Sequence, residues 1–183
     1  MKPTINLYNT LSRKEETFTP INDDVVGIYS CGPTVYHYAH IGNLRAGLTA
    51  DLFYRFFKKF GYEVTYVRNY TDIDDRIIKQ AMDEKTTCEV ITKKFIEQAE
   101  RDYALAGLEA PTHKTLVTDH LPEINTMIEA IIKNGCGYVA KDGEVFFEIS
   151  KFPTYGALSR KPLEDLLAGA RVEVAARRLV DVT

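Results

Sequence analysis

The chain has 183 residues, enough for one domain or for one domain with a small insertion, and its 45% hydrophobic and 27% charged residues are typical of a globular protein with a buried core. A formal net charge of −3 excludes a strongly basic nucleic-acid-binding chain, although a local basic patch could still bind RNA. No apolar run approaches the roughly 20 residues that cross a bilayer, and the first residues form no signal-peptide pattern, so we expect a cytoplasmic location and no membrane partner.

The first elements in chain order predict a parallel sheet. Residues 5–11 are expected to form a short strand, and residues 12–17 a charged, solvated segment. Residues 25–29 are expected to form a strand, and their lack of polar side chains predicts that both faces of this strand are covered. Gly32 and Pro33 end the strand.

A helix and a second strand follow. Apolar residues recur at helical spacing, which predicts a helix, and they are Leu44, Leu48, Leu52 and Phe56. Lys58 and Lys59 lie in the expected last turn and Gly61 lies beyond it, a pattern typical of a helix C-terminus. Residues 63–69 supply the next strand. A strand, a helix and a strand of this length predict a right-handed βαβ unit with parallel strands.

Two further helices are expected after this unit. Residues 71–75 form a strand-end loop in which Thr71 or Asp72 caps a helix that begins at about Asp74. The second helix is expected over residues 86–105. The expected inward-facing residues are Ile77, Ile78, Ala81 and Met82 on the first helix and Val90, Ile91, Phe95, Ala99 and Tyr103 on the second.

The alternation of strands and helices is expected to stop after residue 110. Residues 111–115 are interpreted as a connection, followed by a helix and by a hairpin over residues 137–149. The predicted fold class is therefore α/β. Residues 1–110 would form the first half of a Rossmann-like, parallel-sheet nucleotide-binding domain, and residues 111–183 an inserted α+β module.

The loop between the strand and the first long helix, residues 31–45, is the candidate binding site. In open α/β folds, ligands bind at the carboxyl ends of strands, and a helix N-terminus favours phosphate. His40 and Asn43 fall in the first helical turn, where a ring N–H and a side-chain amide can donate to phosphate oxygens and stabilise charge in a transition state. The alternative for His40 is a purely structural role as a helix cap or core filler.

Other residues near this loop also have structural interpretations. Cys31 lies at a strand end and can be a small buried hydrophobe. Thr34 and Thr71 lie in strand-end loops and can be turn hydroxyls or helix caps.

The spacing of the cysteines and acidic residues gives little support for a metal site. The chain has three widely spaced cysteines, which favour reduced thiols over disulfides, and spacing alone predicts no metal site. An acidic cluster invites a magnesium interpretation, but carboxylates that open a helix usually compensate its dipole. This cluster consists of Asp72, Asp74 and Asp75.

Several motifs, in the same order, resemble those of the class I aminoacyl-tRNA synthetases and, among them, the cysteinyl-tRNA synthetases. Residues 40–43, His-Ile-Gly-Asn, are similar to the signature His-Ile-Gly-His in the form that many cysteine enzymes carry. The other motifs are Cys-Gly-Pro-Thr-Val-Tyr at residues 31–36, Thr-Asp-Ile-Asp-Asp at residues 71–75 and Gly-Ala-Arg-Val-Glu-Val at residues 169–174. The resemblance therefore covers almost the whole chain.

This resemblance implies roles for individual residues. It implies that His40 and Asn43 stabilise phosphate charge and that Gly42 lets adenine lie against the helix. Cys31 would be one ligand of a zinc ion that binds the substrate thiolate and so discriminates cysteine from serine. The family's other zinc ligands lie outside these residues, so the ligand set is incomplete. The remaining residues implied to border the ligands are Pro33 for ATP and Gly32, Thr34, Asn69, Tyr70 and Thr71 for cysteine and its adenylate.

The resemblance also implies an activity. The complete enzyme uses ATP, with magnesium, to make cysteinyl-adenylate and then transfers cysteine to tRNA(Cys). His37 stands where the family usually has Asp or Asn. The family's Lys-Met-Ser-Lys-Ser loop and the second half of its catalytic fold do not occur within the 183 residues, so we expect this chain alone to be inactive. The alternatives are a cysteine ligase of mycothiol synthesis and a non-catalytic paralogue that binds nucleotide, RNA or protein.

Overall fold

The computed structural model describes residues 2–160, which form two compact units. One unit contains residues 2–5 and 18–126, and the other contains residues 6–17 and 127–160. Within residues 2–160, no helix combines the length and the apolar character that a membrane crossing requires.

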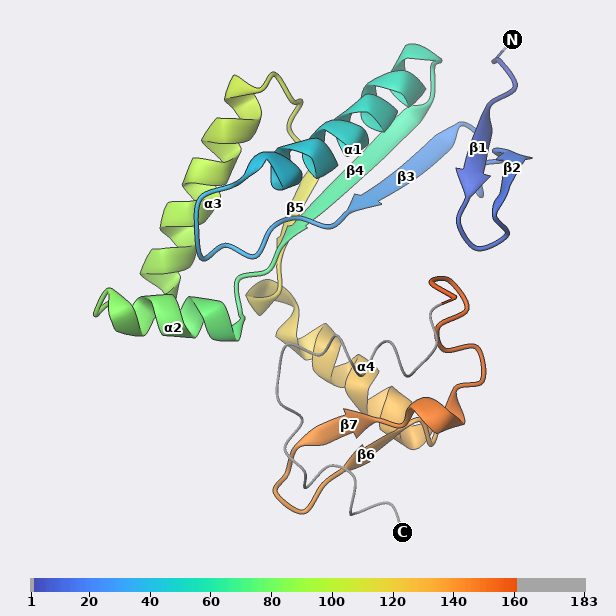
Figure 1. Cartoon of the computed structure of the whole chain (residues 1–183). Helices are drawn as coiled ribbons and strands as arrows, with labels where there is room; N and C mark the ends of the chain where they lie inside the picture. Colours follow the sequence, from blue (N-terminus) through green and yellow to red (C-terminus); the bar gives the residue numbers. More distant parts are fainter. Residues whose placement is uncertain (1, 161–183) are drawn as a thin grey trace. The chain divides into compact units, whose positions relative to one another are not determined.

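The first unit is built on a three-stranded parallel sheet. Its strand order is β3 (Val25–Ser30), β4 (Glu63–Tyr70) and β5 (His113–Leu116), with β4 in the centre (Figure 1). Val25 pairs with Glu63, and the register continues to Ser30, which pairs with Arg68. The predicted α/β fold class and the parallel βαβ unit are therefore confirmed.

Three helices connect and cover these strands. α1 (Ile41–Lys59) joins β3 to β4 and packs on both, while α2 (Asp75–Asp83) and α3 (Cys88–Leu105) join β4 to β5 (Figure 1). As predicted, α1 ends just before Gly61, whose φ of +77° suits glycine. The largest group of buried residues packs α2 and α3 against the end of β4 and consists of Val35, Tyr70, Ile77, Ala81, Ile91, Phe95, Ala99 and Tyr103.

The apolar residues that predicted α1 do not all lie on its buried side. Leu48 and Leu52 are 56% and 65% exposed in the described part of the chain. The buried residues are instead Gly47, Ala50, Asp51 and Phe57. Gly47 packs closely against the side chains of Leu108 and Tyr103, because a Cβ on this residue would lie 2.9 Å from atoms of both. Helical spacing predicted the helix correctly, but it did not predict which side of it packs on the sheet.

The sequence predicted that both faces of the strand over residues 25–29 are covered. For the described residues, this prediction is wrong. Val26 is buried, but Tyr29 is 68% exposed. β3 is an edge strand of this sheet, and its second face has no cover within the described residues.

A third parallel strand replaces the predicted connection at residues 111–115. β5 pairs with β4, so that Val67 lies opposite His113 and Tyr70 lies opposite Leu116. Its polar, mostly exposed side chains gave no apolar alternation to indicate a strand, and backbone pairing with β4 defines it instead. The division into residues 1–110 and 111–183 stays a prediction.

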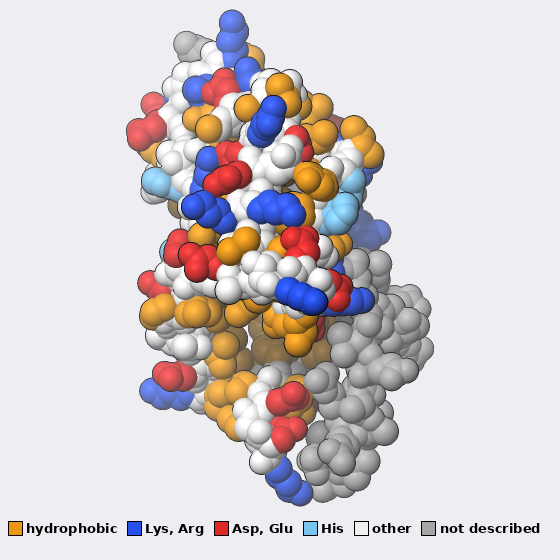
Figure 2. Space-filling view, turned by 90° about the vertical axis from the view of Figure 1, so that its left-hand side faces the viewer, with side chains coloured by type: hydrophobic (Ala, Val, Ile, Leu, Met, Phe, Trp, Pro, Cys, Tyr) orange, Lys and Arg blue, Asp and Glu red, His pale blue; other side chains and the backbone are white. Residues whose placement is uncertain are grey.

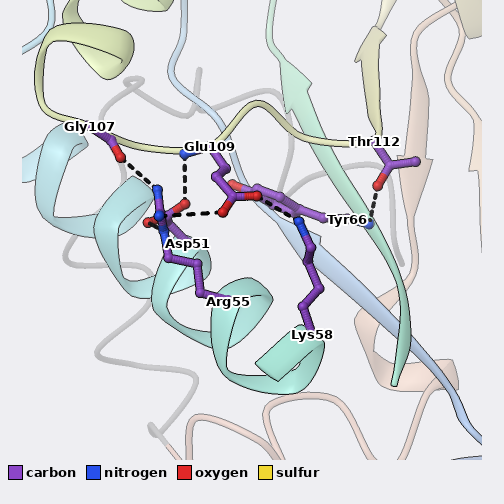
Figure 3. Close-up of polar contacts among 7 residues, drawn as sticks. All are labelled: Asp51, Arg55, Lys58, Tyr66, Gly107, Glu109 and Thr112. Atoms are coloured by element: carbon purple, nitrogen blue, oxygen red, sulfur yellow. Dashed lines mark hydrogen bonds and ion pairs between the residues drawn. The ribbon is translucent and has the colours of Figure 1, made fainter. Parts of the chain in front are cut away.

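Polar contacts attach α1 to the segment between α3 and β5 (Figure 3). Buried Asp51 accepts from the Arg55 Nε at 2.7 Å and from the backbone N–H of Glu109 at 2.8 Å. Arg55 also donates to the Gly107 carbonyl at 2.7 Å, and Lys58 donates to the Glu109 carboxylate at 2.8 Å. Because one buried carboxylate satisfies both a helix side chain and a loop amide, it fixes this loop against α1.

The second unit contains two antiparallel hairpins. β1 (Asn6–Asn9) pairs with β2 (Lys14–Thr17). The side chains of β2 are all exposed, in agreement with the charged, solvated segment predicted at residues 12–17, but the strand itself was not predicted. β6 (Gly137–Val139) and β7 (Val145–Phe147) form the predicted second hairpin. The helix before it, α4 (Leu121–Lys133), extends from the first unit into the second.

Candidate functional site

The loop after β3 is held against the end of β4 by backbone and side-chain hydrogen bonds. The Gly32 N–H donates to the Asn69 Oδ1 at 2.8 Å. The Val35 N–H donates to the Thr71 carbonyl, and the Thr71 N–H donates to the Pro33 carbonyl, both at 3.2 Å. A Cβ at Gly32 would lie 1.7 Å from the Asn69 carbonyl oxygen, so only glycine permits this approach of the two chains.

His40 is the N-cap of α1, and Asn43 completes a reciprocal capping pair. The Gly42 N–H donates to the His40 Nδ1 at 3.0 Å, and the His40 N–H donates to the Asn43 Oδ1 at 3.0 Å. Since Nδ1 accepts a hydrogen bond, the hydrogen of a neutral ring lies on Nε2, which is left as a donor. The amide group of Asn43 likewise keeps its Nδ2 hydrogens for a ligand.

Gly42 is required by the conformation of the His40 ring. A Cβ on Gly42 would lie 2.8 Å from the His40 Cε1 and 2.9 Å from the Nδ1. A larger residue would therefore push the imidazole out of its capping position.

A pocket of about 250 Å³ opens beside this helix N-terminus. It brings together five of the residues that the sequence predicted, which are Gly32, Pro33, Thr34, His40 and Asn43. Its other lining residues are Val35, Tyr36, His37, Tyr38, Ala39, Arg76, Phe95 and Ala99. The pocket is thus formed by the loop after β3 and by residues of α2 and α3.

Five predicted site residues do not line the pocket. Cys31 is exposed, and its Sγ lies 3.5 Å from the Gly32 carbonyl oxygen. Gly42, Asn69 and Thr71 act on the pocket through the contacts described above, because they position the His40 ring and the loop. Tyr70 is buried in the core rather than directed at the pocket.

The hydroxyl of Tyr70 donates to Glu100 on α3. Burial and this hydrogen bond both raise the pKa of Tyr70, so the phenol stays protonated. Glu100 also accepts from the Arg68 Nη2 at 2.8 Å and from Lys114. Burial opposes ionisation of Glu100, but its hydrogen bonds with Lys114 and Tyr70 and the charge of Arg68 outweigh burial and lower its pKa. This cluster ties α3, which supplies the Phe95 wall of the pocket, to β4 and β5.

The pocket is also lined by aromatic residues and by Arg76, none of which the sequence predicted as site residues. The His37 ring stacks on Phe95 with centroids 6.2 Å apart and an interplanar angle of 12°, and Tyr38 meets the same ring edge-on at 5.3 Å. Phe95 and Ala99 were predicted only as inward-facing helical residues. Arg76 adjoins the acidic cluster, but nothing in the sequence indicated that it reaches the pocket.

The acidic cluster has a structural role, and the predicted cap of α2 is corrected. Asp74, not Thr71 or Asp72, is the N-cap and accepts from the Arg76 N–H at 2.9 Å. Asp72 accepts from the N–H groups of Val117 and Thr118, at 2.8 and 3.2 Å, and from the Thr118 hydroxyl. Because protein donors already bind the Asp72 and Asp74 carboxylates, these two residues do not support magnesium ligation.

The described residues around Cys31 do not complete a zinc site, so the role of Cys31 as a zinc ligand stays a prediction. Within residues 2–160, no three His, Cys, Asp or Glu side chains are grouped as a metal site requires. The motif predicted at residues 169–174 lies outside the described residues.

Charge is mixed on the surface of the molecule. Figure 2 shows acidic and basic side chains interspersed over the face that it presents, rather than one basic field on that face. This agrees with the formal net charge of −3.

The chain is an α/β domain with a parallel sheet, a capped helix N-terminus and a pocket at the carboxyl ends of its strands, which is where ligands bind in open α/β folds. The family model for the catalytic domain of class I tRNA synthetases of the cysteine type, "tRNA synthetases class I (C) catalytic domain", matches residues 17–182. The chain belongs to this family, and the predicted family and enzyme class are confirmed.

Curated relatives agree with the family match. The cysteine–tRNA ligase of Mannheimia succiniciproducens is 43% identical over 170 residues, which are 93% of this chain and 37% of the relative. The cysteine–tRNA ligase of Geobacter metallireducens is 43% identical over 175 residues, 96% of this chain and 36% of the relative. The chain thus spans little more than a third of the length of these proteins.

Proposed function

We propose that this chain is part of a cysteine–tRNA ligase and that its pocket binds ATP and cysteine for the formation of cysteinyl-adenylate. The single observation that carries this proposal is the capping pair of His40 and Asn43, which leaves one donor on each side chain beside the pocket. The whole protein would use ATP with magnesium, cysteine and tRNA(Cys) in the cytoplasm. Family membership and the named relatives support this assignment.

The proposed reaction places negative charge where these donors lie. The cysteine carboxylate attacks the α-phosphorus of ATP, a phosphorus–oxygen bond forms, and the bond to the pyrophosphate leaving group breaks. Charge grows on the non-bridging oxygens of the α-phosphate in the transition state. The His40 Nε2–H and the Asn43 amide would donate to these oxygens, and the N-terminus of α1 adds the positive end of its dipole.

These fixed donors would bind the α-phosphate oxygens of ATP in the ground state, and more strongly in the transition state, because they need no reorganisation as the charge develops. Gly42 contributes by making room for the His40 ring, and its contact with adenine remains a proposal from the family resemblance. Gly32, Asn69 and Thr71 hold the loop that carries Thr34. Cysteine selection through a zinc ion at Cys31 stays a prediction.

Calorimetric titration of the chain with ATP tests this proposal. We expect ATP to bind, and His40→Ala or Asn43→Ala to weaken binding about ten- to a hundredfold, the usual effect of losing a hydrogen bond to a charged group. His113→Ala on β5 is the matched control, because His113 is exposed and does not line the pocket. Unchanged ATP affinity in both pocket variants would contradict the proposal.

A further inference from the structure

Arg76 is the one arginine among the residues that line the pocket, and its guanidinium is fixed by three neighbouring residues. Its Nε donates to the Asp74 Oδ1 at 2.8 Å, and its Nη2 donates to the Asp74 Oδ2 at 3.2 Å. The same Nη2 donates to the Thr34 Oγ1 at 3.1 Å. The guanidinium carbon lies 4.8 Å from the centre of the Tyr36 ring. Arg76 therefore links the first turn of α2 to the loop after β3.

This contact determines how the Thr34 hydroxyl can bind a ligand. A guanidinium has only donors and does not lose its proton in proteins, so the Thr34 oxygen must accept from Arg76. The hydroxyl hydrogen is then directed elsewhere and remains a donor. Thr34 lines the pocket, so a ligand atom that accepts a hydrogen bond is its complementary partner.

We propose that Arg76 is a positioning residue that orients the Thr34 hydroxyl as a donor to an anionic oxygen of the ligand. This inference rests on the proposed function, in which that oxygen belongs to a phosphate or to the aminoacyl carboxylate of cysteine. Asp74 balances the charge of Arg76, so the contribution of Arg76 is directional and does not require its own contact with the ligand. Thr34 and His40 would then supply two donors to one pocket.

Two probes distinguish the possible sources of the oxygen. ATP carries phosphates without an amino acid, whereas cysteine carries the carboxylate without a phosphate. Dissociation constants of both probes are measured for the wild-type chain and for Thr34→Val, Thr34→Ser, Arg76→Met and Arg76→Lys. We expect Thr34→Val and Arg76→Met each to raise the dissociation constant of at least one probe about tenfold. Thr34→Ser should retain the wild-type affinity for both probes.

The double variant separates positioning from a general structural effect. If Arg76 acts through Thr34, the combination of Thr34→Val with Arg76→Met binds no more weakly than either single variant. Arg76→Lys should recover part of the affinity, because an ammonium can still donate to Thr34. Lys79→Met, an exposed change on the same helix, is the matched control.

The outcomes are distinguishable. If Arg76→Met binds both probes with wild-type affinity, the role of Arg76 is overturned and the proposed function stays intact. The same conclusion follows if the fold-loss of affinity in the double variant equals the product of the two single fold-losses. If the wild-type chain binds neither probe, the proposed function fails and this inference fails with it. Should Arg76→Met unfold, the comparison of Thr34→Val with Thr34→Ser still decides whether the hydroxyl donates to the ligand.

Discussion

Gly42→Ala is the sharpest test of how His40 is placed. The new Cβ would lie 2.8 Å from the His40 Cε1, a separation that real Cβ atoms essentially never show, so the ring must leave its capping position. The hydrogen bond from the Gly42 N–H to the His40 Nδ1 is then lost. The substitution thus changes the direction of the Nε2–H without removing the imidazole.

The expected effects on stability and on binding differ. Loss of an N-cap costs about 0.5–2 kcal/mol, and replacing a helical glycine by alanine returns about 0.5–1 kcal/mol. The net change in the free energy of unfolding should therefore lie between a gain of about 0.5 kcal/mol and a loss of about 1.5 kcal/mol. A charged oxygen of ATP then loses its hydrogen bond from His40, which is worth about 1.5–3 kcal/mol. The dissociation constant of ATP should therefore rise about ten- to a hundredfold.

Urea unfolding followed by circular dichroism measures the first effect, and calorimetric titration with ATP measures the second. Gly27→Ala is the matched control, because a Cβ on Gly27 in β3 meets no atom within 4 Å. Gly42→Ala with an ATP affinity within about twofold of the wild type would refute the reasoning that the capping conformation of His40 creates the binding site.

Three further substitutions test the scaffold. Gly32→Ala places a Cβ against the Asn69 carbonyl and should reduce the unfolding free energy by about 2–4 kcal/mol, measured in urea. Asp51→Ala removes a buried acceptor of the Glu109 N–H and should cost about 2–4 kcal/mol in the same assay. Glu100 has a pKa lowered from 4.5, so its stabilising contribution is complete above that pH and is lost as pH falls through the lowered value. Glu100→Gln should therefore flatten the fall in stability as the pH drops below 4.5.

Matched exposed positions provide the controls for these changes. Asp83→Ala and Glu97→Gln alter exposed carboxylates on α2 and α3, and Gly27→Ala again serves for the glycine. We expect each control to change the unfolding free energy by less than about 0.5 kcal/mol. If Glu97→Gln flattens the pH dependence as much as Glu100→Gln, the argument from the Tyr70 and Lys114 contacts is wrong.

The βαβ core was predictable because its signals are local. The spacing of apolar residues and Gly61 indicated α1 and its end, and residues 63–69 had strand character. β5 was missed, since its residues become a strand only through pairing with β4. The buried side of α1 was also missed, because Gly47 and Asp51 pack through close approach and hydrogen bonding rather than through a row of large apolar side chains.

The candidate site was predictable only where residues adjoin one another in sequence. His40 and Asn43 share one helical turn, so their placement followed from the expected helix start. Arg76 and Phe95 reach the same pocket from later helices, and their side-chain directions depend on tertiary packing. Tyr70 shows the opposite error: it follows Asn69 in the strand, but alternation along β4 turns its ring into the core.

The most direct test of the central claim is an amide NMR titration of the chain with ATP, which maps binding residue by residue. The proposed function predicts the largest chemical-shift changes in the loop after β3 and at the start of α1, including Gly32, His40 and Asn43, and at Arg76. Largest changes on the β6–β7 hairpin, or no changes at saturating ATP, would contradict it.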